Sequence, residues 1–318
     1  MKLSKSFIGL VTVSTIFMLY ASGLYKNLQS DSALEIVDFS IAKPASEKNI
    51  PSNPDRVPLY GDLHVHTKYS FDAYIFGVTA TPYDAYKYAI GEAIKHPLGF
   101  DMKLKEPLDF YAVTDHGFYM GMIENYADTS SEMSKNEWTK PMHNLNRPEN
   151  VTVESLGARA DLFSSVLTQA IIKPYPYWHP KVWKAWLTNN IQVALQSFDY
   201  DVHKSAWADV ANAAEEFNDP GNFTTFIGYE FTTSTDVEGG NLHRNVIFDS
   251  SKAPIRPWTR IDSLNPEDLW TWMDGLRDQG LDSLAMPHNS NGSNGQMFEV
   301  ETFRGDPISI EYAEKRMR

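Results

Sequence analysis

The sequence predicts an α/β fold that carries a helical insertion. Short apolar runs typical of strands alternate with segments of helical periodicity, as in α/β units. Several of these strands run directly into histidine, aspartate or glutamate, which is typical of sites at the carboxyl ends of strands. A stretch at about 119–215 has helical periodicity and no strand pattern, and it is too long for a simple crossover. It therefore predicts an inserted helical subdomain.

Composition limits the possible classes of function. The chain has 318 residues, of which 42% are hydrophobic, enough for one large domain or two ordinary ones. A net charge of −13 disfavours nucleic acid as a general partner, because phosphate binding requires a basic surface. The chain has no cysteine, which excludes disulfides, thiolate chemistry and sulfur-ligated zinc. Any bound metal would therefore have nitrogen and oxygen ligands.

The N-terminal region predicts export. Residues 1–23 combine a basic start, an apolar run and the small residues of a cleavage site, which indicates a signal peptide. The uncharged run extends over residues 7–25, so an uncleaved membrane anchor is the alternative. Either way the chain would be periplasmic, secreted or anchored outside the cytoplasm. Residues 24–57 are polar and proline-containing, and we expect a linker with little fixed structure before a globular domain over 58–318.

The first strand carries the most informative motif, Gly-Asp-Leu-His-Val-His at residues 61–66. Side chains alternate along a strand, so His64 and His66 point to the same face and form half of a metal site. Asp72 follows eight residues after His64, where the chain could fold its carboxylate back to the same ion. An isolated pair of this kind is common, so the prediction depends on similar residues elsewhere.

Further elements follow in the order expected of an α/β fold. Thr81 and Pro82 predict the start of a helix over 82–93, and a strand over 108–113 runs into Asp115 and His116. The aromatic residues of 175–186, within the insertion, are expected to pack against the main domain.

The second half of the chain predicts three strands and one helix. Strands over 224–232 and 242–248 predict a hairpin or neighbouring pair and carry Glu230 and His243. A helix over 266–279, capped by Ser263 or Asn265, precedes a strand over 282–287 that ends at His288.

Polar side chains at strand ends form one constellation. Five of the nine histidines belong to it, and any one of them alone would be read as a structural residue. Together they predict two or three divalent ions, Zn, Mn or Fe, with Glu230 a candidate to bridge two of them. The predicted ligands are His64, His66, Asp72, His116, Glu230, His243 and His288. We expect the other histidines (96, 143, 179 and 203) to be structural or surface residues.

The order of these motifs resembles the PHP (polymerase and histidinol phosphatase) superfamily. The phrases GDLHVHTKYSFDA, DFYAVTDHG, FIGYEFT, GGNLHRNVIF and MPHNSNG look more closely like the bacterial family DUF3604 over about 58–300. The resemblance implies a distorted (β/α)7 barrel with up to three metal ions. His64, His66 and Glu230 would bind the first ion; Glu230, His243 and His288 the second; Asp72 and His116 the third.

Two departures from the superfamily pattern stand out. Asp72 replaces a common histidine, which could change the metal preference. The final Asp-x-His motif of the superfamily is missing after His288. We therefore expect a barrel truncated at its C terminus, in a fragment of a longer product, because missing final strands would leave an open sheet edge.

The first functional hypothesis is a hydrolase of phosphate esters that uses a metal-activated water on a small phosphorylated substrate. Arg244 could bind a phosphate oxygen or be a structural arginine, and Asp115 could orient a ligand, transfer a proton or cap a turn. An amidohydrolase-type enzyme acting on C–N or C–O bonds is the second hypothesis, although no lysine lies in a later strand to bridge two ions. A non-catalytic metal-binding or recognition module, left by truncation, is the third.

Overall fold

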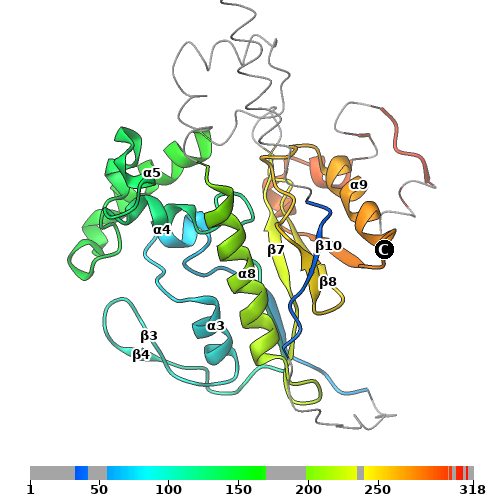
Figure 1. Cartoon of the computed structure of the whole chain (residues 1–318), viewed down its shortest axis with the longest axis horizontal. Helices are drawn as coiled ribbons and strands as arrows, with labels where there is room; N and C mark the ends of the chain where they lie inside the picture. The colour runs from blue at the N-terminus through cyan, green and yellow to red at the C-terminus, as the bar shows by residue number, and fades with distance from the viewer. Residues whose placement is uncertain are drawn as a thin grey trace, which may run out of the picture.

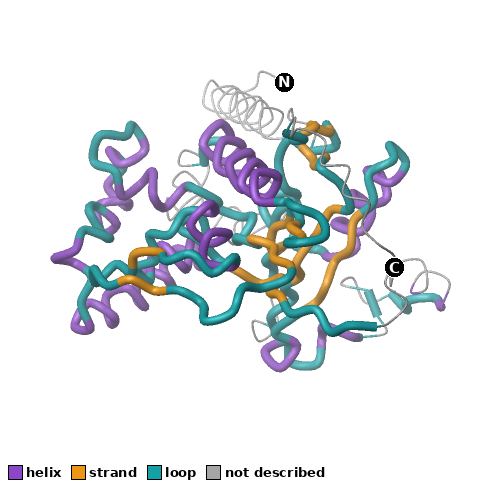
Figure 2. The backbone as a smooth tube through the Cα atoms, turned by 90° about the horizontal axis from the view of Figure 1, so that it is seen from below, coloured by secondary structure: helices purple, strands orange, loops and turns teal. Residues whose placement is uncertain are grey.

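The computed structural model describes residues 33–41, 56–169, 198–234, 240–299, 301–302, 306–310 and 313. Within this part of the chain the strands form four small sheets. Most strands lie in the middle of the molecule with helices around them (Figures 1 and 2). The fold is mixed α/β, and the described strands do not form a closed barrel.

The first sheet is parallel and has the order β2-β5-β6. Its strands are β2 (Gly61–Val65), β5 (Phe110–Val113) and β6 (Thr224–Thr225). Helix α3 (Pro82–Ala89) connects the first two and packs against α8 (Tyr200–Phe217), which precedes β6. Both helices pack against this sheet, and Trp207 of α8 is fully buried, with its ring close to those of Tyr229 and Phe248. The predicted strand, helix, strand unit is therefore confirmed.

Helix α3 begins as the sequence predicts and ends earlier. Thr81 and Asp84 form a reciprocal capping box, with Pro82 at the first helical position. The helix stops at Ala89 rather than continuing to residue 93. Gly91 follows with a φ of +83°, a left-handed conformation that terminates helices.

The second sheet is antiparallel and has the order β10-β8-β7. Its strands are β7 (Gly228–Phe231), β8 (Arg244–Phe248) and β10 (Ser283–Pro287). The predicted pairing of the strands that carry Glu230 and His243 is confirmed. Helix α9 (Pro266–Arg277) covers this sheet, and Asn265 rather than Ser263 is its N-cap. A parallel bridge between His116 and Glu230 joins the two sheets at the site.

A helical region lies beside the first sheet (Figure 1). It contains the short helices α2 (Phe71–Ile75) and α4 (Met122–Ala127), 3-10 turns at 133–155, and α5 (Leu156–Gln169). These elements share a second hydrophobic core centred on Phe71, Phe118 and Tyr126. No strand occurs between 119 and 215 where the structure describes it, as predicted. The aromatic residues of 175–186 lie outside the described residues.

Two short pairs of strands lie outside the main sheets. β1 (Ile36–Asp38) pairs antiparallel with β9 (Lys252–Pro254), and Trp272 of α9 donates to the carbonyl of Ala33 over 2.7 Å. The expectation of a linker without fixed structure is therefore wrong for residues 33–41. β3 (Ile94–Lys95) and β4 (Asp101–Met102) form a small hairpin. The predicted targeting segment, residues 1–23, lies outside the described residues, and no helix within them is long and apolar enough to span a bilayer.

Candidate metal centre

Glu230 is the centre of the site. It lies in β7, where Tyr229 and Phe231 point into the core and Glu230 points to the opposite face, as strand alternation requires. Its backbone N–H donates to the Asp115 carbonyl over 2.9 Å, which ties β7 to the end of β5. The carboxylate is only 1% exposed, yet it faces five imidazole rings.

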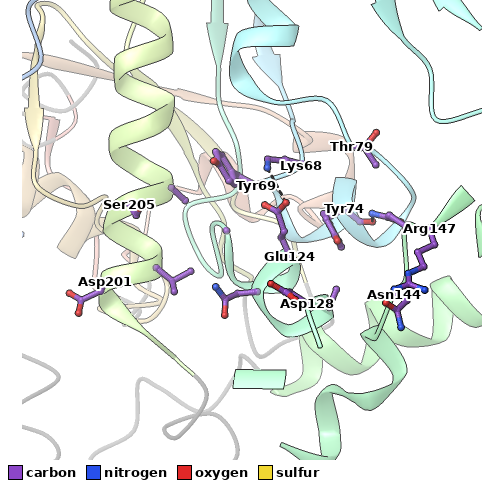
Figure 3. Close-up of a pocket in the computed structure, with 16 residues that line it drawn as sticks. Lys68, Tyr69, Tyr74, Thr79, Glu124, Asp128, Asn144, Arg147, Asp201 and Ser205 are labelled. Atoms are coloured by element: carbon purple, nitrogen blue, oxygen red, sulfur yellow. Dashed lines mark hydrogen bonds and ion pairs between the residues drawn. The ribbon is translucent and has the colours of Figure 1, made fainter. Parts of the chain in front are cut away.

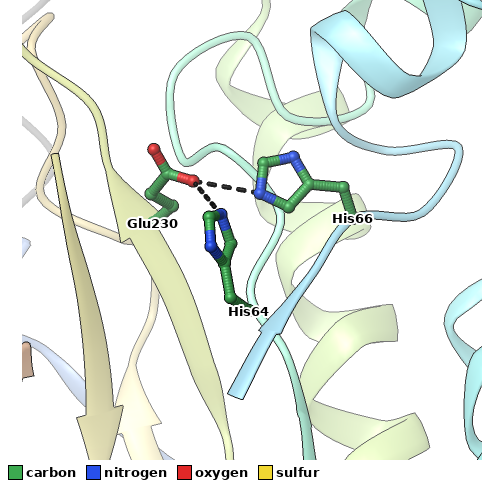
Figure 4. Close-up of side chains that lie close together, drawn as sticks. All are labelled: His64, His66 and Glu230. Atoms are coloured by element: carbon green, nitrogen blue, oxygen red, sulfur yellow. Dashed lines mark hydrogen bonds and ion pairs between the residues drawn. The ribbon is translucent and has the colours of Figure 1, made fainter. Parts of the chain in front are cut away.

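Two of these rings come from the first strand motif (Figure 4). The Nε2 atoms of His64 and His66 lie 3.2 and 3.0 Å from Oε2 of Glu230. The two ring centres are 5.0 Å apart, because alternation along the chain brings both side chains to the same face. The predicted placement of His64 and His66 on one face is therefore confirmed.

Three other rings face the second oxygen of Glu230. His116 Nδ1, His243 Nδ1 and His288 Nε2 lie 3.2, 2.7 and 3.4 Å from Oε1. They follow or precede different strands, β5, β8 and β10, so residues far apart in sequence meet at one carboxylate. Thr232, two residues after Glu230, contributes a hydroxyl that contacts His116 Nδ1.

Asp72 supplies a second carboxylate at the site. Its Oδ1 lies 3.3 Å from His66 Nδ1 and its Oδ2 lies 3.3 Å from His116 Nε2. His66 and His116 therefore each place one ring nitrogen toward Asp72 and the other toward Glu230. Ser70 donates to Asp72 Oδ1 over 2.6 Å and lies 3.0 Å from His66 Nδ1. The structure thus brings together all seven predicted ligands.

The arrangement fits divalent ions. Three groups of ligand atoms lie within 4.8 Å of one another; they are His64, His66 and Glu230; His66, Asp72 and His116; and His116, Glu230 and His243. Ligands about 2.1 Å from a tetrahedral Zn²⁺ lie roughly 3.3 Å apart, close to the separations found here. In addition, among the described residues the buried Nδ1 of His288 has no hydrogen-bond partner, and its Nε2 has only the 3.4 Å contact with Glu230. A buried ring nitrogen without a hydrogen bond is costly unless it binds something.

The electrostatics of the cluster link metal binding to protons. Burial opposes charging His66, but its hydrogen bonds with Asp72 and Glu230 raise its pKa to about 10. Burial also opposes charging Glu230, which raises its pKa, but the neighbouring His116 and hydrogen bonds from the rings outweigh burial and hold the pKa of Glu230 well below the usual range. Burial lowers the pKa of His243. Because metal ligands must be deprotonated, ion binding would release protons and weaken as the pH falls.

Asp115 contacts the chain next to a predicted ligand. It is fully buried, and it accepts hydrogen bonds from the Thr67 backbone N–H over 2.5 Å and from the Thr67 hydroxyl over 2.7 Å. Burial raises the pKa of Asp115 to about 6, while these bonds oppose the shift. Thr67 directly follows His66, so Asp115 positions the loop that carries a ligand. These contacts favour the orienting role over proton transfer.

Arg244 is directed away from the cluster. Its guanidinium lies 5.5 Å from the ring centre of Trp270 in α9 and donates to the carbonyl of Leu242 over 2.7 Å. His243 and Arg244 are adjacent on an extended chain, so their side chains point to opposite faces. The hypothesis that Arg244 contacts a phosphate oxygen therefore finds no geometric support.

The remaining described histidines are structural, as predicted. His203 is buried and its Nε2 donates to the carbonyl of Gly117, His143 Nε2 lies 2.9 Å from the carbonyl of Ser134, and His96 stacks on Phe100. His179 lies outside the described residues. Sequence reasoning missed Ser70 and Thr232, although both lie within two residues of a predicted ligand, which is the signal that could have identified them.

A separate pocket of about 820 Å³ lies beside α4 and α8 (Figure 3). Lys68, Tyr69, Glu124 and Arg147 line part of it, and Lys68 pairs with Glu124 over 2.9 Å. None of the seven predicted metal ligands lines it. We therefore assign the candidate chemistry to the His, Asp and Glu cluster and not to this pocket.

Comparison with protein families gives a match over most of the chain. Searches of curated proteins and of solved structures found no match. Residues 53–318 match a family described as "Protein of unknown function (DUF3604)". This range includes every residue of the candidate metal centre and most of the chain. The chain therefore belongs to the DUF3604 family.

Proposed function

We propose that the protein is a metal-dependent hydrolase that acts on phosphate esters. The main support is the environment of Glu230, a buried carboxylate whose two oxygens face separate sets of imidazoles. A carboxylate with ligands on both oxygens is suited to bridge two ions. When bound there, divalent ions would supply Lewis acidity, an activated water and a clamp for phosphoryl oxygens.

The chain's own residues would orient this centre. Asp72 and Ser70 hold the Nδ1 side of the His66 ring, and Asp115 holds the following residue, Thr67. Such outer contacts fix the orientation of a ligand and tune its affinity for metal. The side chains of His64 and Asp72 are 40% and 28% exposed, whereas that of Glu230 is buried. This difference supports substrate approach from the side of His64 and Asp72.

The superfamily, the barrel fold and the export of the protein are also proposals. We infer that DUF3604 is related to the PHP superfamily, and that β2, β5 and β7 correspond to strands of a distorted (β/α)7 barrel. The shared end of the parallel strands β2 and β5 and the bridge from His116 to Glu230 support this relation. Export from the cytoplasm, as a periplasmic, secreted or anchored protein, rests on residues 1–25 of the sequence.

The proposal is tested by measuring metal content and hydrolysis on the same preparations. Elemental analysis would be combined with hydrolysis of aryl phosphate mono- and diesters by the wild type, His64→Ala and His116→Ala. His143→Ala is the matched control, since the imidazole of this histidine hydrogen-bonds to the Ser134 carbonyl and is not one of the predicted ligands. We expect two or three ions in the wild type, and activity lost in the two ligand variants only.

The other outcomes separate the alternatives. A wild type that binds metal but hydrolyses neither ester class would contradict the phosphoesterase proposal. Hydrolysis of amides or carboxylic esters would then favour an amidohydrolase-type enzyme. The absence of any hydrolysis would favour a binding module. A wild type without bound metal after incubation with Zn²⁺, Mn²⁺ and Fe²⁺ would reject the metal centre itself.

A further inference from the structure

The loop that joins β9 to α9, residues 255–265, packs against the segments that carry two of the candidate metal ligands. The carbonyl of Leu264 accepts a hydrogen bond from Thr233, three residues after Glu230. The carbonyl of Trp258 accepts one from Tyr229 over 2.8 Å. A Cβ built on Gly117 would lie 3.1 Å from the Thr259 side chain. This loop is therefore packed against the segments that hold Glu230 and His116.

Arg260 in this loop is an unusual arginine. It is only 2% exposed, and its Nε and Nη2 atoms are buried without a hydrogen-bond partner among the described residues. No carboxylate pairs with it in the part of the chain that the structure describes. Burial lowers the pKa of Arg260 only to about 10, so the side chain remains charged at neutral pH. A buried charge without a partner is costly, so its presence requires an explanation.

Two other buried arginines of this protein have hydrogen-bond acceptors for their guanidinium groups. Arg256, four residues earlier in the same loop, makes two bonds of 2.9 and 2.8 Å to the carboxylate of Asp262. Arg159 donates to several backbone carbonyls and to a side-chain oxygen. Arg260 instead has an aromatic contact, with its guanidinium carbon 5.1 Å from the centre of the Phe118 ring. Stacking on a ring face leaves the in-plane N–H donors free.

The position of Phe118 connects Arg260 to the metal centre. Phe118 follows His116 by two residues, and the two ring centres are 6.3 Å apart. Phe118 also contacts Phe71, the neighbour of Asp72, with ring centres 4.5 Å apart. Arg260 is thus separated from a predicted metal ligand by a single aromatic ring.

We propose that Arg260 binds an oxyanion group of the substrate, most simply a phosphate, beside the metal centre. Nε–H and Nη2–H form one edge of the guanidinium, and this edge matches two oxygens of a phosphate or carboxylate. The free donors are therefore the pair needed for bidentate binding. This inference rests on the proposed function and replaces Arg244 with Arg260 as the anion-binding arginine.

The test uses inorganic phosphate as the probe and the full chain loaded with metal. Calorimetry would measure phosphate binding to the wild type, Arg260→Met and Arg260→Lys, with metal content measured on each. Methionine keeps an apolar stem against Phe118 and removes the charge. Arg277→Met is the matched control, because this arginine lies at the surface end of α9 and pairs with Asp274 and Asp282.

We expect Arg260→Met to weaken phosphate binding by about tenfold to a hundredfold, the range for a charge-assisted contact. Arg260→Lys is expected to restore part of it, and the control and all metal contents are expected to be unchanged. In phosphate-free buffer, Arg260→Met should be at least as stable as the wild type, because it removes an unpaired buried charge. Arg256→Met should be less stable, because Asp262 loses its partner.

Three results would overturn the inference. They are unchanged phosphate affinity in Arg260→Met, no phosphate binding by the wild type, or a stability loss in Arg260→Met as large as that in Arg256→Met. Other results would distinguish a failure of the proposed hydrolase function from a failure of the role of Arg260. Phosphate binding that depends on Arg260, without ester hydrolysis, would reject only the hydrolase. Hydrolysis with the same KM in Arg260→Met would reject only the role of Arg260.

Discussion

Acid is expected to destabilise the protein through His203, which supports the segment that carries His116. His203 is 1% exposed in α8, and its Nε2–H donates to the carbonyl of Gly117 over 2.7 Å. Its Nδ1 is buried and has no hydrogen-bond partner in the part of the chain that the structure describes. Burial lowers the pKa of His203 to about 4, and the charges of Arg256 and Lys204 act in the same direction, whereas Gly117 and Asp262 oppose it.

The sign and size of the effect follow from proton linkage. An unfolded histidine has a pKa near 6.5, so between about pH 6.5 and 4 the unfolded chain binds a proton that native His203 does not. The stabilising contribution is complete above pH 6.5 and is lost as the pH falls toward 4. For a native pKa of about 4, the loss at pH 5 is about 2 kcal/mol of unfolding free energy.

Denaturant unfolding with a metal chelator present checks this prediction. The wild type and His203→Gln would be compared at pH 7.5 and pH 5, since glutamine can still donate to Gly117 but does not titrate. We expect the wild type to lose about 2 kcal/mol more than the variant between the two pH values. His96→Gln serves as the control. Equal losses in the wild type and His203→Gln would refute the reasoning.

Three further substitutions test the framework of the site. Arg159→Met should lower stability by about 3 kcal/mol or more, because buried backbone acceptors lose their donor; these are the carbonyls of Ile75, Leu145 and Asn150. A loss below 1 kcal/mol in denaturant unfolding would count against this. Gly117→Ala should cost about 1–3 kcal/mol, because the new Cβ would lie 2.8 Å from the buried Tyr229 ring; unchanged thermal unfolding would contradict it. Thr81→Ala should cost about 1 kcal/mol through loss of the capping box with Asp84, and an unaltered unfolding midpoint would contradict that.

The sequence was sufficient to predict that these side chains lie together, because two local rules agree. Alternation along a strand brings His64 and His66 to one face, and strand ends bring Glu230, His243 and His288 to one region. The same alternation rule argues against Arg244 as a phosphate ligand. It directly follows His243 on the chain and must point to the other face.

Other features depend on partners that a single sequence does not identify. β1 has only three residues, and its pairing with β9 joins positions more than 200 residues apart. The apolar pair within it was too short to indicate a strand. Arg260 and His203 belong to a loop and a helix without any motif, and their importance comes from burial and from missing or distant partners. The antiparallel direction of β8 was likewise one of several arrangements that the strand pattern allowed.

The most direct test of the metal centre is the number of ions held by two matched variants. Two of the three ligand groups include Glu230, whereas the third consists of His66, Asp72 and His116. Metal content measured by elemental analysis should therefore be two or three ions per chain in the wild type and at most one in Glu230→Gln. Asp72→Asn should lose only one ion. Equal metal content in the wild type and Glu230→Gln, or no metal in the wild type, would contradict the account of Glu230 as the shared ligand.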